Sequence, residues 1–165
     1  MKHQPSWNLL LASAIGAQAA SHAYAFTLRT VLAHNVGRLM AGNPEPLLRA
    51  FADHATLVLD GTHSWSGQHR GKPAIRAFFE RFLAERIRGE LHEVLVAGPP
   101  WRTLMTARFT DEAIDAEGRI VYQNHAIILA HVRWGRIVYQ RIFEDTQRVA
   151  RFDEYLASSN SVGEQ

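Results

Sequence analysis

The second half of the sequence consists of four long runs of strand-forming residues separated by short turns. The runs are LHEVLVAG, RTLMTARFTDEAID, RIVYQNHAIILAHVR and RIVYQRIFED, and the segments between them are GPPW, AEG and WG. Connections of this length and composition join neighbouring antiparallel strands, and the two-residue connection Trp134-Gly135 indicates a tight hairpin. The pattern therefore predicts an antiparallel meander of four strands over residues 91–145.

Helical patterns dominate the first half of the chain. Apolar residues recur every three to four positions over Phe26–Met40, a Gly-Asn-Pro sequence ends this helix, and a shorter helix covers Glu45–Ala52. The strand-like sequence ATLVLDG comes next, followed by a long helix, Pro73–Ile87, with proline at its first position. This order predicts an α+β fold, a curved antiparallel sheet with the two long helices across its concave side. We expect a cone-shaped α+β barrel, with a last helix over Gln147–Leu156.

The length and composition fit one domain and exclude several kinds of functional site. The chain has 165 residues, enough for a single core, and it has no cysteine, which excludes disulfides, thiol nucleophiles and cysteine metal sites. The formal net charge is only +2, and the arginines mostly alternate with acids, as in RAFFERFLAERIRGE. A nucleic-acid-binding protein usually has a clustered basic face. We therefore expect no nucleic acid among its partners.

Residues 1–25 have two interpretations that the sequence leaves open. An early lysine, an apolar run over Leu9–Ala20 and an Ala-Tyr-Ala sequence match an export signal that is cleaved after Ala25. The alternative is an alanine-rich helical extension of a protein that stays in the cytoplasm, which is the location we expect. The segment is too short and too polar for stable membrane insertion.

Three segments carry a resemblance to a known family. They are AGNPEPLLRAFADHATLVLDG, SWSGQHRGKPAIRAFF and GRIVYQRIFEDTQRVARFDEYL. In these segments and in element order, the chain from about Phe26 to Leu156 resembles the nuclear transport factor 2-like superfamily, specifically its SnoaL-like and ketosteroid-isomerase-like branch. The resemblance implies a SnoaL-like domain over residues 26–157 with a conical cavity, followed by a polar tail over residues 158–165. It implies no single activity, because isomerases, cyclases, epoxide hydrolases, dehydratases and binding modules share this scaffold.

The catalytic residues of ketosteroid isomerases are not matched. The tyrosine that donates to the oxyanion in those enzymes corresponds here to Asn35. Their general base corresponds to Leu59, with Asp60 one residue later in an Asp-Gly turn, and their second acid falls near Ile128 or Leu129. The resemblance therefore does not extend to steroid-type isomerase chemistry.

The catalytic residues of limonene-epoxide-hydrolase-like enzymes are not matched either. Their Arg-x-Asp sequence corresponds to Arg108-Phe109-Thr110, which keeps the arginine and lacks the aspartate. Their aspartate on the last strand corresponds to Ile142. With both carboxylates absent, that mechanism is not expected here.

Strand alternation gives an independent set of candidate site residues. Alternate residues of a strand point to one face, and the resemblance implies which face of the last three strands lines the cavity. The HSWSGQHRG junction before the second long helix would form the rim. The candidate catalytic residues are His63, Arg108 and Glu144, and the candidate ligand-binding residues are Asn35, Trp65, Tyr122, Asn124, Ile128, Gln140 and Ile142.

The three candidate catalytic residues are expected to converge on one cavity. An ion pair with Arg108 would lower the pKa of Glu144 by roughly one to three units. His63 would then carry the proton at neutral pH, and Arg108 would stabilise an oxyanion. The structural alternatives are that Glu144 favours a helix dipole, that Arg108 forms a structural ion pair and that His63 belongs to a surface loop. A metal site would need a third ligand beside His63 and His69, and none is apparent, so we expect neither a metal nor a cofactor.

The sequence thus predicts a protein that binds a small apolar molecule with a few polar groups. The expected activity, if there is one, is acid–base chemistry by an isomerase, cyclase or dehydratase on a mostly apolar hydroxy- or keto-compound. The alternative is a non-catalytic dimeric binding or interaction module of the same fold. Because both faces of the Arg119–Arg133 strand carry apolar residues, we expect a homodimer that buries one of them.

Overall fold

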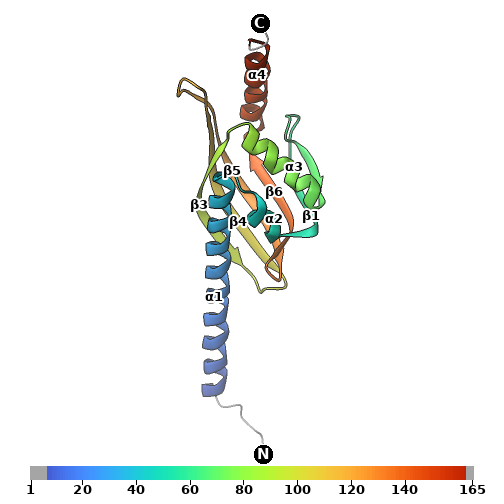
Figure 1. Cartoon of the computed structure of the whole chain (residues 1–165). Helices are drawn as coiled ribbons and strands as arrows, with labels where there is room; N and C mark the ends of the chain where they lie inside the picture. The colour runs from blue at the N-terminus through green and yellow to red at the C-terminus, as the bar shows by residue number, and fades with distance from the viewer. Residues whose placement is uncertain (1–6, 163–165) are drawn as a thin grey trace, which may run out of the picture.

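The computed structural model describes the backbone of residues 7–162 and the side chains of residues 18–159. One sheet of six strands carries helices on one face, and the first and last helices project from opposite ends of the molecule (Figure 1). The helices are α1 (Trp7–Met40), α2 (Glu45–Ala50), α3 (Gly71–Ala84) and α4 (Thr146–Val162). The strands are β1 (Phe51–Leu59), β2 (Gly67–Arg70), β3 (Arg88–Ala97), β4 (Thr103–Ile114), β5 (Ile120–Arg133) and β6 (Arg136–Glu144).

The sheet confirms the predicted meander. Its strand order is β2-β1-β6-β5-β4-β3, so the last four strands of the chain follow one another as antiparallel neighbours. β1 pairs in parallel with β6 and antiparallel with the short β2, which the sequence did not predict. The sheet is curved and unclosed, and α1, α2 and α3 cover its concave side, as the α+β prediction stated (Figure 1).

The first helix includes residues before Phe26, a segment for which a helical extension was one of the two interpretations. α1 is continuous over Trp7–Met40, whereas the pattern of apolar residues placed its start at Phe26. Its C-terminal part buries Val36 and Leu39 against the sheet, and its N-terminal part projects beyond the sheet (Figure 1). No helix in the described part of the chain is both long enough and apolar enough to cross a membrane.

The other chain end also differs from the prediction. α4 begins at Thr146 and runs to Val162, so it includes the first residues of the segment that the sequence marked as a polar tail from Ser158. The first residues of the predicted leader, 1–6, and the last residues of the predicted tail, 163–165, lie outside the described residues.

Aromatic packing between α3, α4 and the sheet holds the fold together and bounds the site. Phe51 at the start of β1 and Phe152 of α4 are almost fully buried, and Phe79 of α3 meets the Phe51 ring edge-on at 6.1 Å. Burying a side chain of this size contributes about 1.5–3 kcal/mol. This core fixes α3 above β1, and a cavity remains between α3, α1 and the middle of the sheet.

Candidate functional site

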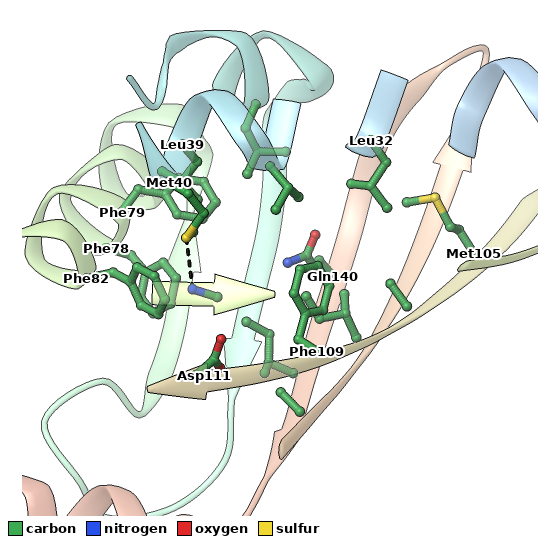
Figure 2. A pocket seen from close by; sticks show the side chains of 17 residues that line it. Leu32, Leu39, Met40, Phe78, Phe79, Phe82, Met105, Phe109, Asp111 and Gln140 are labelled. Atoms are coloured by element: carbon green, nitrogen blue, oxygen red, sulfur yellow. Dashed lines mark hydrogen bonds between the residues drawn. The ribbon is translucent and has the colours of Figure 1, made fainter. Parts of the chain in front are cut away.

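The main cavity lies between α1, α3 and the concave face of the sheet (Figure 2). Its volume is about 90 Å³. The described residues that line it are mainly aliphatic and aromatic and include no Lys, Arg or His: Leu32, Val36, Leu39, Met40, Leu47, Phe78, Phe79, Phe82, Gly89, Met105, Ala107, Phe109, Asp111, Ala126, Ile128, Gln140 and Ile142. The polar side chains among them are those of Asp111 and Gln140. Apolar walls with few polar groups are typical of a site for a small organic molecule.

Asp111 supplies the only carboxyl group among the described residues of the cavity lining. Its β4 position lies opposite Gly89 of β3 and Asn124 of β5. A Cβ added to Gly89 would lie 2.9 Å from the Asp111 Oδ1, so the glycine leaves room for the carboxyl group. Burial raises the pKa of Asp111 to about 7. This carboxyl group therefore exchanges a proton at neutral pH.

Gln140 is the second polar group of the cavity. It lies on β6, its side chain reaches into the cavity, and only 7% of the residue is exposed (Figure 2). Its amide makes no hydrogen bond to any other described residue. A buried amide is stabilised by a hydrogen-bond partner, so Gln140 is available to bind a polar group of a ligand.

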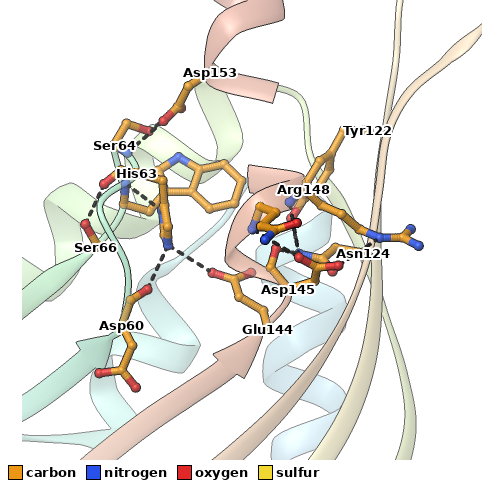
Figure 3. Close-up of polar contacts among 12 residues, drawn as sticks. Asp60, His63, Ser64, Ser66, Tyr122, Asn124, Glu144, Asp145, Arg148 and Asp153 are labelled. Atoms are coloured by element: carbon orange, nitrogen blue, oxygen red, sulfur yellow. Dashed lines mark hydrogen bonds and ion pairs between the residues drawn. The ribbon is translucent and has the colours of Figure 1, made fainter. Parts of the chain in front are cut away.

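Glu144 provides a second buried carboxyl group at the end of β6. Its side chain is 4% exposed, and its Oε1 has no hydrogen-bond partner among the described residues. The Nε2 of His63 lies 3.9 Å away, beyond hydrogen-bond distance (Figure 3). Burial first, and then the negative charge of Asp111, raise the pKa of Glu144 to about 7. The charge of Asp111 therefore acts on Glu144, whereas burial alone raises the pKa of Asp111.

Arg108 does not lie with the other predicted catalytic residues. On β4 the buried residues Met105, Ala107 and Phe109 face the helices, so Arg108 points to the opposite face of the sheet. Its side chain is 51% exposed and lies 3.9 Å from that of Glu93. The predicted convergence of Arg108 with the two other residues is therefore wrong, and so is the lowered pKa of Glu144 that depended on it.

His63 is buried beside Glu144 and bonded to its own loop. Its Nε2 lies 2.9 Å from the backbone oxygen of Asp60, and its Nδ1 accepts a 3.3 Å hydrogen bond from the backbone N–H of Trp65 (Figure 3). These partners fit the neutral ring with its hydrogen on Nε2. Because backbone groups occupy both nitrogens, His63 does not offer a free acceptor to a ligand. Asp153 of α4 holds the loop by accepting bonds from the backbone N–H and hydroxyl of Ser64, at 2.8 and 2.6 Å.

Tyr122 and Asn124 form a structural link between the sheet and α4. Asn124 donates to the Tyr122 hydroxyl at 3.2 Å and to the backbone oxygen of Asp145 at 3.1 Å, and its own oxygen accepts from the backbone N–H of His125 (Figure 3). Burial and the charge of Glu144 raise the pKa of Tyr122. The hydrogen-bond capacity of Asn124 is largely used within the protein.

The structure divides the other predicted ligand-binding residues into two groups. Gln140, Ile128 and Ile142 line the main cavity. Trp65 instead lies in the core, where its ring N–H donates to Glu85 at 2.7 Å, and Asn35 lines a smaller apolar cavity beneath α1.

The sequence reasoning missed Asp111 and the phenylalanines of α3 and β4 that enclose the cavity. A signal for Asp111 was present, because the apolar residues Met105, Ala107 and Phe109 alternate in step with it along β4. No group of three or more His, Cys, Asp or Glu side chains suited to a metal occurs among the described residues.

Solved structures share this architecture. Bal32a, from a soil-derived mobile gene cassette, is 21% identical, with a TM-score of 0.63 over 78% of this chain and 98% of its own. An NTF2-like protein of unknown function from Burkholderia pseudomallei is 14% identical, with a TM-score of 0.65 over 76% of this chain and 96% of its own. A candidate polyketide cyclase from Xanthomonas campestris pv. campestris is 17% identical, with a TM-score of 0.57 over 78% of this chain and 96% of its own. At these identities the similarity shows a shared fold.

The fold, with its apolar cavity under helices, is thus that of the nuclear transport factor 2-like proteins. The family model for the SnoaL-like domain matches residues 29–140, and the chain belongs to that family. No curated protein matches the sequence.

Proposed function

We propose that the protein binds a small, mostly apolar hydroxy- or keto-compound in the main cavity and acts on it by acid–base chemistry. The observation that carries this proposal is Asp111, a carboxyl group in an apolar cavity whose pKa is raised to about 7. A general acid or base is most effective when its pKa lies near the working pH. The fold relative described as a candidate polyketide cyclase adds support for reactions of keto-compounds.

The proposed reaction is proton transfer at a carbon next to a carbonyl group, as in an isomerisation or a ring closure. The ionised carboxylate of Asp111 takes the proton from carbon, and the electron pair moves onto the carbonyl oxygen. The amide N–H of Gln140 donates a hydrogen bond to that oxygen. Such a bond stabilises the developing negative charge most strongly where water is excluded. The proton then returns from Asp111 to another atom of the same molecule, so the carboxylate is regenerated.

Glu144 would tune this chemistry through its charge. The charge of Asp111 raises the proton affinity of Glu144. Because repulsion between like charges is mutual, the pair favours states that hold one proton over the doubly ionised state. The pair would therefore supply one acid and one base at neutral pH, provided that no cation neutralises it. Among the described residues, no Lys or Arg contributes to the pKa shift of either carboxyl group.

The test is hydrogen exchange at carbon. Simple cyclic ketones and hydroxyketones are incubated with the protein in D₂O, and the loss of the proton next to the carbonyl is followed by NMR. We expect Asp111→Asn to slow the catalysed exchange by about a hundredfold or more. Glu90→Gln is the matched control, because the Glu90 side chain lies on neighbouring β3 and is 77% exposed. Catalysed exchange that survives in Asp111→Asn would refute the assignment of the base.

We also propose that the outer face of the sheet packs against a second copy of the chain. Ile127 of β5 and Phe143 of β6 are register neighbours on this face and are 44% and 45% exposed. Leu95 and Leu104 add apolar area on β3 and β4. Exposed apolar side chains on several neighbouring strands of one sheet face indicate an interaction surface. If the unmodified protein catalyses exchange in none of the ketones while the dimer persists, a non-catalytic dimeric module becomes the better description.

A further inference from the structure

An exposed pair of tryptophans lies at the end of the sheet formed by the β3–β4 and β5–β6 turns. Trp101 is 56% exposed and Trp134 is 72% exposed, and their ring centroids are 5.9 Å apart. The backbone N–H of Trp134 donates to the backbone oxygen of Pro100 at 2.7 Å, which ties the two turns together. Large aromatic side chains this exposed, and held side by side by the backbone, indicate a binding surface.

The charged residues of the two turns that carry this pair have one sign. Arg102 and Arg133 are the chain neighbours of the two tryptophans, both are exposed, and neither forms an ion pair with another described residue. The turn sequences GPPWR and RWGR contain no acidic residue. The surface therefore complements an anionic partner.

An uncharged part of α1 adjoins the tryptophan pair. The hydroxyl groups of Tyr24 and Thr103 are 2.8 Å apart, which joins α1 to the first residue of β4. Residues 18–27 of α1 carry no Asp, Glu, Lys or Arg, most of them are exposed, and Phe26 is 68% exposed. Figure 1 shows α1 continuing past this end of the sheet.

We propose that Trp101, Trp134, Arg102, Arg133 and the adjoining surface of α1 dock the protein on an anionic lipid surface without crossing it. Tryptophan prefers the interface between lipid and water, because its ring is apolar and its N–H is polar. Arginines beside it favour anionic headgroups. A dimer in which this surface met itself would place the same arginines against each other, which disfavours a second copy as the occupant. Such an anchor is weak and reversible.

The experiment is co-sedimentation of the full chain with vesicles. One set consists of phosphatidylcholine alone and the other of equal parts of phosphatidylcholine and phosphatidylglycerol. We expect binding to the mixed vesicles, a blue shift of the tryptophan fluorescence, and loss of binding as salt is added. Arg102→Gln with Arg133→Gln should weaken binding roughly 25-fold, about five-fold for each charge removed.

Three further variants separate the alternatives. Trp101→Ala with Trp134→Ala should abolish binding while keeping the backbone bond between the turns, and Phe26→Glu should weaken it. Ile120→Ala is the control, because Ile120 is 58% exposed and begins β5 at the opposite end of the sheet, where it pairs with Ile114 of β4. Thermal melting of each variant confirms that it is folded.

Absence of binding to mixed vesicles, or binding that the tryptophan variant retains, would overturn the proposal. If the unmodified chain does not bind vesicles, two other assays compare it with the tryptophan variant. Self-association that the variant loses would assign the surface to a second copy of the chain, and oligonucleotide binding that the variant loses would assign it to a single-stranded nucleic acid.

Discussion

Replacing Glu144 by glutamine should stabilise the protein at neutral and alkaline pH. The pKa of Glu144 rises from 4.5 to about 7 because the folded protein buries this carboxyl group and places it under the charge of Asp111. Each pKa unit corresponds to about 1.4 kcal/mol, so ionised Glu144 lowers the free energy of unfolding by roughly 3 kcal/mol. Glutamine has nearly the same shape and carries no charge, so the variant avoids this loss.

The direction of the Glu144 pKa shift determines the pH range over which the stability of the protein changes. The folded-state pKa lies above the unfolded-state pKa, so the folded protein binds more protons between about pH 4.5 and pH 7. The contribution of Glu144 to stability is therefore fully present below pH 4.5 and is lost as the pH rises through 7. Unmodified protein and variant should have similar stabilities near pH 4.5, and the variant should be more stable by roughly 3 kcal/mol at pH 8.

Urea unfolding followed by circular dichroism between pH 4.5 and pH 8.5 measures this difference. Histidines and other acids also titrate in this range, but they contribute equally to both proteins and cancel in the difference. Glu90→Gln, at a largely exposed position of β3, should show no such pH dependence. A variant whose advantage does not grow with pH would show that Glu144 is solvated or paired in solution, and the assignment of a buried, unpartnered carboxyl group would fail.

Three other predictions concern the loop and the assembly. Gly61→Ala should lower stability by at least about 1–2 kcal/mol in thermal melting, because Gly61 has a φ of +118° and an added Cβ would lie 2.7 Å from the His63 ring. Asp153→Ala should speed hydrogen exchange at the Ser64 amide, because it removes both bonds to that residue, and unchanged exchange would contradict the link between loop and α4. Ile127→Glu should convert the proposed dimer into a monomer in light scattering, and a monomer before substitution would refute the dimer.

The fold was predictable because each local signal agreed with its neighbours. The GPPW, AEG and WG connections determine which strands pair, and the helical period of Phe26–Met40 determines which side chains face the sheet. β2 was missed because the residues of Gly67–Arg70 carry no apolar alternation and pair only at the sheet edge. The start of α1 was left open, because residues 1–25 match an export signal as well as an alanine-rich helical extension.

The candidate site was less predictable because an error of one residue reverses the face of a strand. Arg108 was assigned to the cavity by its resemblance to an Arg-x-Asp sequence, while the apolar residues of β4 placed Asp111 there instead. That single assignment also reversed the expected pKa of Glu144, because a neighbouring cation lowers a carboxyl pKa and burial raises it. The direction of a pKa shift depends on three-dimensional neighbours, which the strand pattern alone does not supply.

The raised pKa values of the Asp111 and Glu144 carboxyl groups are themselves an argument for function. Asp111 and Glu144 are buried without a cation among the described residues, and both cost stability once they ionise. An uncharged side chain of similar shape at either position would remove that cost. Groups that lower stability in this way are concentrated at active sites, where the chemistry requires them. The position of Asp111 in the wall of an apolar cavity, with the free amide of Gln140 in the same wall, therefore favours catalysis over simple packing.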